Sequence, residues 1–224
     1  MCFSATASFA AAAILAPSGL YGLKKAIKEN SRYVMLAVVV IVFAFQQMLE
    51  GFVWLAYDPA VTGGGDTTVI LATAFLFFSH FYWPVMMPVT VYFVEEDKKR
   101  KKVFLIVTAL SFVFSLFLYF PMVFTPDGIG VKVIKHSIMY DMKVFYDNFI
   151  SRTVTGFVYL SFIILPLIFS SDKNLKYFGC TIILAGIPTY FFYYHAFTSV
   201  WCFFAAIASI YIAYILSQST VRQK

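Results

Sequence analysis

The sequence predicts an all-α polytopic membrane protein: one membrane domain, residues 1–224, built as a bundle of seven transmembrane helices. Three observations predict it: the composition, the lengths of the apolar runs and the placement of the basic residues. The chain is 61% hydrophobic and 12% charged, whereas a soluble domain is about 45–50% apolar and about 25% charged. This composition excludes a soluble enzyme, a disordered tail and a nucleic-acid-binding module, even though the net charge is +6.

A membrane-spanning helix needs about 20 apolar residues, and seven stretches meet this need. We expect helices at residues 3–23, 33–57, 68–94, 103–124, 153–169, 177–193 and 195–217. The first stretch has no basic segment before it, so we expect an uncleaved span and not a signal peptide.

The last two helices come from one uncharged stretch, residues 177–221, which is too long for a single span. The turn between them lies between Gly186 and Phe197. Pro188 favours an early break, while equal division of the stretch favours a turn near His195. The sequence leaves both positions open.

Basic residues gather in alternate loops, and Lys and Arg in short loops stay on the cytoplasmic side. One side holds Lys24, Lys25, Lys28, Arg32, the run 98–102, Lys173, Lys176, Arg222 and Lys224. The other side holds only Lys132, Lys135, Lys143 and Arg152. We therefore expect the N-terminus outside and the C-terminus in the cytoplasm, and we interpret the run 98–102 as a topology anchor.

The long loop at residues 125–152 is expected on the outer side. It carries apolar residues at spacings of three and four, which is typical of a helix: Val131, Ile134, Ile138, Met142, Phe145 and Phe149. A helix lying in the outer interface is one interpretation. An ordinary structured loop is the other.

Glu50 is the only formally charged residue inside a predicted span and away from its ends. Gln46, Gln47 and Trp54 share a helical face with it. A carboxylate at this depth is a functional hypothesis by default because its burial costs free energy. The alternative is a protonated Glu50 that is hydrogen-bonded to another helix.

Two further groups of polar residues lie in the predicted spans. His80 precedes Pro84, which is expected to leave a backbone carbonyl without its usual donor one turn back, at His80 itself. His195, Ser199 and Cys202 follow at i, i+4 and i+7, so they share one helical face. Core hydrogen bonding and polar packing between helices are the alternatives.

The N-terminus adds Cys2 and Ser4. Removal of Met1 would expose Cys2 with a free amine, so its thiol is a candidate nucleophile or metal ligand; the alternative is a small residue at a helix start. All these residues are expected to line one outward-opening cavity. The candidates are Glu50, His80 and Cys2 for catalysis; Gln46, Gln47, Trp54, Ser4, Ser199 and Cys202 for binding; and Glu50, His80 and His195 for a metal.

Two function classes and one structural alternative remain open. The first is an intramembrane hydrolase that depends on a thiol or on zinc, since Glu, His and Cys are acceptable zinc ligands, although neither HExxH nor CxxC spacing occurs. The second is a proton- or cation-coupled transporter or sensor of small molecules that uses Glu50. The structural alternative is a membrane subunit without an activity of its own. We expect the lipid bilayer and a small-molecule or lipid ligand as partners, and no nucleic acid.

Three segments carry a resemblance to a known family: MCFSATASF at the N-terminus, QQMLEG at residues 46–51 and SVWCFFAA at residues 199–206. Together they resemble an uncharacterised family of bacterial seven-helix membrane proteins that begin Met-Cys-Phe-Ser-Ala. The resemblance implies an inner-membrane protein. It implies no activity, substrate or cofactor.

Overall fold

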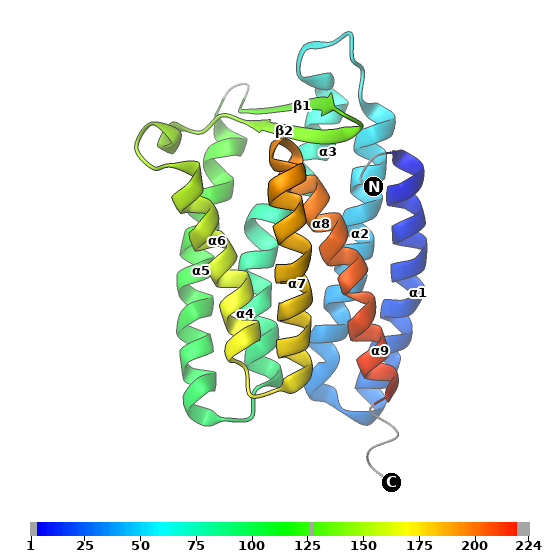
Figure 1. Ribbon diagram of the computed structural model, residues 1–224, viewed down its shortest axis with the longest axis vertical. Helices are drawn as coiled ribbons and strands as arrows, with labels where there is room; N and C mark the ends of the chain where they lie inside the picture. Colours follow the sequence, from blue (N-terminus) through cyan, green and yellow to red (C-terminus); the bar gives the residue numbers. More distant parts are fainter. Residues whose placement is uncertain (1–3, 126–127, 219–224) are drawn as a thin grey trace.

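The computed structural model describes residues 4–125 and 128–218 and consists of a helical bundle with a β-hairpin across one end (Figure 1). The helices are α1 (Ala5–Glu29), α2 (Val34–Ala56), α3 (Asp66–Leu76), α4 (Trp83–Val94), α5 (Lys98–Phe124), α6 (Arg152–Phe169), α7 (Lys173–Phe192), α8 (Phe197–Ala208) and α9 (Ile210–Gln218). The strands are β1 (Ile129–Ile134) and β2 (Ser137–Met142). Short helical turns are η1 (Ser31–Tyr33), η2 (Thr62–Gly64), the π-helix η3 (Phe77–Tyr82), η4 (Phe145–Asn148) and η5 (Tyr194–Ala196).

Seven helical segments of the described chain are long and apolar enough to cross a membrane. Three of them join consecutive elements: η1 with α2, α3 with η3 and α4, and η5 with α8 and α9. The bundle has two ends, which we name by their contents. The hairpin end comprises the start of α1, residues 57–65, β1, β2 and η5; the lysine-rich end comprises residues 24–33, 94–102 and 169–176.

The long loop contains a β-hairpin, so the interfacial helix considered for residues 125–152 is wrong and the fold is not purely α. β1 and β2 pair antiparallel, with Val131 opposite Tyr140. Val131 and Tyr140 are buried against the bundle, while Lys132 and Asp141 face outward and form an ion pair at 2.7 Å. Ile129, Val131 and Val133 of β1 and Ile138, Tyr140 and Met142 of β2 share one face with a period of two, and Ile134 of the predicted helical stripe lies on the other face.

The turn between the last two spans lies at η5, which contains His195. Pro188 lies inside α7 and does not end it. The early break that Pro188 favoured is therefore not seen, and His195 sits at the hairpin end, where α8 begins.

The first two helices pack closely along their length. A Cβ placed on Gly19 would lie 2.7 Å from Ile41 Cγ1, and one on Gly51 would lie 2.6 Å from the ring of Phe9. Neither position has room for a side chain, so the two glycines permit this close helix contact. α2 thereby becomes the most enclosed span together with the last one, and it carries Glu50 in the interior.

At the lysine-rich end, the Glu95 carboxylate joins two loops. It accepts hydrogen bonds from the backbone N–H groups of Glu96 and Asp97 at 3.1 Å and from Ser171 N–H at 2.8 Å. The hydroxyls of Ser170 and Ser171 also donate to it. Burial alone would raise the pKa of Glu95, but these hydrogen bonds outweigh burial and hold the pKa below its usual value.

A second set of contacts joins the same end to the start of α2. Tyr33 donates its hydroxyl to Asp172 Oδ2 at 2.6 Å, and Arg32 donates to the Tyr33 hydroxyl and pairs with Glu96. Asp172 also caps α7 through Asn174 N–H at 2.8 Å. Three connections between spans are thus tied together by hydrogen-bonded charged groups.

Candidate functional site

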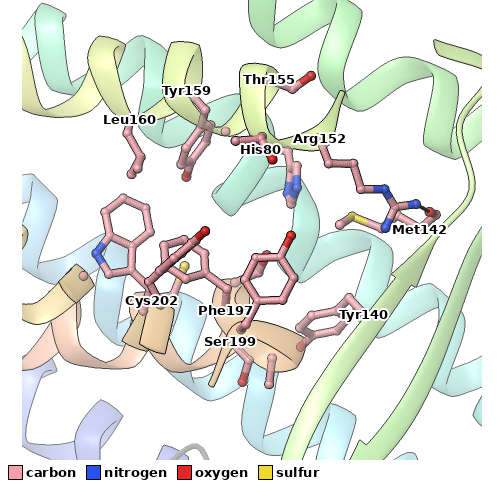
Figure 2. Close-up of a pocket in the computed structure, with 18 of the residues that line it drawn as sticks. His80, Tyr140, Met142, Arg152, Thr155, Tyr159, Leu160, Phe197, Ser199 and Cys202 are labelled. Atoms are coloured by element: carbon pink, nitrogen blue, oxygen red, sulfur yellow. Dashed lines mark hydrogen bonds between the residues drawn. The ribbon is translucent and has the colours of Figure 1, made fainter. Parts of the chain in front are cut away.

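A cavity of about 540 Å³ lies beneath the hairpin, in the half of the bundle toward the hairpin end. η3, α6, α7, α8 and β2 supply its walls, and most wall residues are apolar. Figure 2 shows His80, Tyr159, Ser199 and Cys202 from three different spans around the same space. This combination of apolar walls and a few polar groups is typical of small-molecule binding sites, and the volume is in their usual range.

Ser199 connects the cavity to Glu50. Its hydroxyl lies on the cavity wall and donates to Glu50 Oε1 at 2.5 Å. The Glu50 side chain is fully buried behind this wall. Cys202, one turn further along α8, also lines the cavity and lies close enough to Glu50 and Gln46 to interact with both. The shared face predicted for Ser199 and Cys202 therefore points at the site.

Gln46, Gln47 and Trp54 surround Glu50 on α2, but none of them lines the cavity. Gln46 accepts a hydrogen bond from Trp83 Nε1 at 2.6 Å. Gln47 is fully buried, and neither its amide nitrogen nor its amide oxygen has a protein partner. Trp54 Nε1 likewise has none. α2 therefore holds a buried polar patch on the far side of Ser199 from the cavity.

His80 reaches the cavity because it lies in the π-helix η3. Trp83 N–H bonds to Phe78 O, and Pro84 has no N–H for the next carbonyl, that of Ser79. Tyr159 of α6 donates its hydroxyl to that carbonyl at 2.5 Å. The π-helix therefore makes the carbonyl that Pro84 leaves free that of Ser79, and the expectation that it is the carbonyl of His80 is wrong. The hydrogen bond from Tyr159 fixes its ring against the cavity. His80 itself contacts the Ser79 hydroxyl through Nδ1 at 2.8 Å.

His195 lies where the hairpin meets α8. Its Nε2 is 3.2 Å from the hydroxyl of Ser137, the first residue of β2. On the other side of the hairpin, the ring of Tyr140 stacks on Phe75 of α3 with centroids 4.9 Å apart. The hairpin therefore contacts helical elements on both sides and covers the cavity.

The rim of the cavity carries a charged pair that the sequence did not single out. Arg152 donates to Asp147 Oδ2 at 2.6 Å and to the Met142 carbonyl at 2.7 Å (Figure 2). Burial, with a smaller effect of Asp147, raises the pKa of nearby Tyr146 to about 12, so its hydroxyl stays protonated and donates to Leu118 O at 3.1 Å. These contacts depend on the hairpin and left no signal in the residue spacing.

Ser4, at the start of α1, does not line the cavity. Ser4 caps α1 by accepting a hydrogen bond from Ala7 N–H at 3.2 Å, and Cys2 lies outside the described residues. Within residues 4–125 and 128–218, no three His, Cys, Asp or Glu side chains come together to hold a metal ion. Glu50, His80 and His195, predicted to share a metal, therefore form no such group, and each of these side chains contacts a different serine.

Comparison with known proteins gives a family and no activity. A family of unknown function, DUF6629, matches residues 1–224. No curated protein and no solved structure matches the chain. The site geometry must therefore be interpreted on its own chemistry. With its whole length matched, the chain belongs to the DUF6629 family.

Proposed function

We propose that this protein is a membrane-embedded binding protein of the sensor or transporter class, which holds a mainly apolar small molecule in the cavity beneath the hairpin. The cavity of about 540 Å³ carries the proposal, because one of its wall residues, Ser199, is bonded directly to the buried carboxylate of Glu50. Apolar walls with a few fixed polar groups are suited to orienting such a ligand.

Glu50 gives the site a means of coupling. A carboxylate in a membrane span is costly unless it is paired, protonated or hydrated, and such residues mark ion and proton pathways. A change in the protonation of Glu50 alters what its oxygen offers to the Ser199 hydroxyl, and that hydroxyl faces the ligand space. Ligand occupancy and proton occupancy are thereby linked through the Ser199–Glu50 hydrogen bond.

A thiol-dependent hydrolase is less well supported. A cysteine nucleophile needs a base within hydrogen-bonding reach. Cys202 is the one described cysteine on the cavity wall, but among the described residues neither His80 nor His195 is hydrogen-bonded to it. Both histidines contact serine hydroxyls instead.

The orientation belongs to the same proposal. The lysine-rich end lies in the cytoplasm under the positive-inside rule, so the cavity lies in the half of the bundle toward the outer leaflet. The resemblance of the three sequence segments supports a bacterial inner membrane as the location.

Native mass spectrometry of the purified protein tests the binding function. Ile183 lines the cavity, whereas Leu184, the next residue of α7, is 67% exposed and does not line it. We expect a bound small molecule on the wild type and on Leu184→Trp, and its loss from Ile183→Trp, because the indole fills the ligand space. Equal retention by all three proteins would contradict binding in this cavity.

A further inference from the structure

The cavity beneath the hairpin extends to the membrane-facing surface between α6 and α7. Its walls include Phe157 of α6 and Phe191 of α7, and these side chains are 68% and 75% exposed. Residues deep in the bundle, such as Trp201 and Ile182, belong to the same cavity. One continuous space therefore runs from the core of the bundle to the surface of two spans.

What lies outside this opening follows from its position. α6 and α7 both qualify as membrane spans. The opening lies along the first turns of α6 and the last turns of α7, where Gly156 and Ile187 line it, below the hairpin. A span crosses the hydrocarbon core with about 20 apolar residues, so we expect the ends of α6 and α7 near the edge of that core, where acyl chains begin. The surroundings of the opening are therefore lipid and not water.

Along its length the cavity changes from charged to apolar, as a lipid changes from its headgroup to its acyl chain. The charged pair Arg152–Asp147 lies at the rim, at the start of α6. Apolar residues such as Leu160 and Ile164 follow further along the same helix. A headgroup would meet the charged rim, where Arg152 is fixed by its bond to the Met142 carbonyl. An acyl chain would meet the apolar wall.

We propose that the occupant of the cavity is a membrane lipid whose acyl chain enters sideways between α6 and α7. This inference rests on the proposed binding function and names its ligand class. The chain passes Gly156, where a Cβ would meet no atom within 4 Å, and ends beside Trp201. The headgroup remains at the rim near Arg152.

Quenching of Trp201 by lipid bromine tests this entry. The chain has three tryptophans, so Trp54→Phe with Trp83→Phe leaves Trp201 as the only reporter. Trp201 is 4% exposed and lines the cavity, so an acyl chain inside the cavity lies close to its ring. In vesicles of phosphatidylcholine brominated on its acyl chains, we expect most of the Trp201 fluorescence to be lost relative to unbrominated vesicles.

A matched pair of variants on α6 shows whether the opening is the route. Gly156→Phe places a ring in the open space of the mouth, while Val154→Phe adds the same ring at an exposed position that does not line the cavity. We expect Gly156→Phe to remove most of the quenching and Val154→Phe to preserve it. The comparison is repeated with all three tryptophans present, so that a folding defect of the double variant cannot decide the result.

The outcomes separate this inference from the proposed function. Absence of Trp201 quenching, or quenching that Gly156→Phe leaves unchanged, overturns lateral lipid entry. If a bound molecule is nevertheless lost from Ile183→Trp and kept by Leu184→Trp, the binding function stands with a ligand that enters by another route. If Ile183→Trp and Leu184→Trp also retain the bound molecule equally, the proposed binding function is contradicted together with lipid entry.

Discussion

The two ends of the bundle use buried polar groups in opposite ways. At the lysine-rich end, five donors converge on Glu95, which is 2% exposed. In the hairpin half, Gln47 keeps both amide atoms without a protein partner, and a cavity of about 540 Å³ lies beside Glu50. A saturated network stabilises one arrangement of the chain. Open space beside a buried carboxylate is instead expected of a site that exchanges ligands or protons.

The largest predicted effect is at the lysine-rich end. Glu95→Gln replaces one acceptor oxygen by an NH₂ group that faces donors, including Ser171 N–H. We expect the free energy of unfolding in bicelles to fall by about 3 kcal/mol, since buried donors lose a charged acceptor. Glu96→Gln is the control: it removes an exposed ion pair with Arg32, and such pairs contribute about 0–1 kcal/mol. Equal losses in the two variants would contradict the contrast between the ends.

The same carboxylate predicts how stability depends on pH. Burial raises the pKa of Glu95, and its hydrogen bonds lower it further than burial raises it, so the folded pKa is below the unfolded one. Its contribution is therefore fully present above the unfolded pKa of about 4.3 and is lost as pH falls through the folded pKa. We expect acid to destabilise the wild type more than Glu95→Gln. Parallel pH curves for the two proteins would disprove this role.

The sequence predicted more of the bundle than of the site. Apolar runs require nothing beyond local composition, so the membrane character followed from them. The hairpin at residues 129–142 did not, because Val131 and Ile138 fit a helical spacing and the face that they share appears only after β1 and β2 pair. Glu50 and Ser199 were each singled out, but their bond joins residues 149 positions apart. The Arg152–Asp147 rim requires the hairpin and carries no pattern of its own.

A smaller effect is expected where Tyr159 donates to the Ser79 carbonyl. Tyr159→Phe keeps the ring and its edge contact with Trp201, but it leaves a buried carbonyl that Pro84 cannot satisfy. We expect a loss of about 1–2 kcal/mol in the unfolding assay. Tyr119→Phe is the matched control, since Tyr119 also donates to a backbone carbonyl, that of Thr73, at 3.2 Å. Thr73 O keeps the Phe77 N–H as a donor, so we expect Tyr119→Phe to lose less unfolding free energy than Tyr159→Phe.

The smallest expected change in stability is at Glu50, and it is the sharpest test of the contrast with Glu95. Glu50→Gln keeps an oxygen that accepts from Ser199 and removes a group whose charged form is costly in a span. We therefore expect the unfolding free energy to change by less than about 1 kcal/mol. Glu50→Gln should instead change how retention of the bound molecule depends on pH. Native mass spectrometry from acidic to neutral pH measures this retention.

The direction of that change follows from the chemistry of the amide. Gln is a permanent analogue of the protonated carboxyl, so Glu50→Gln should retain the ligand at every pH as the wild type does in acid. Ser199→Ala leaves Glu50 titratable but removes the hydrogen bond that joins this carboxylate to the cavity wall, so the pH dependence of ligand retention should be weakened. A wild-type retention that ignores pH, or a Glu50→Gln profile that overlays it, would make Glu50 a structural residue like Glu95.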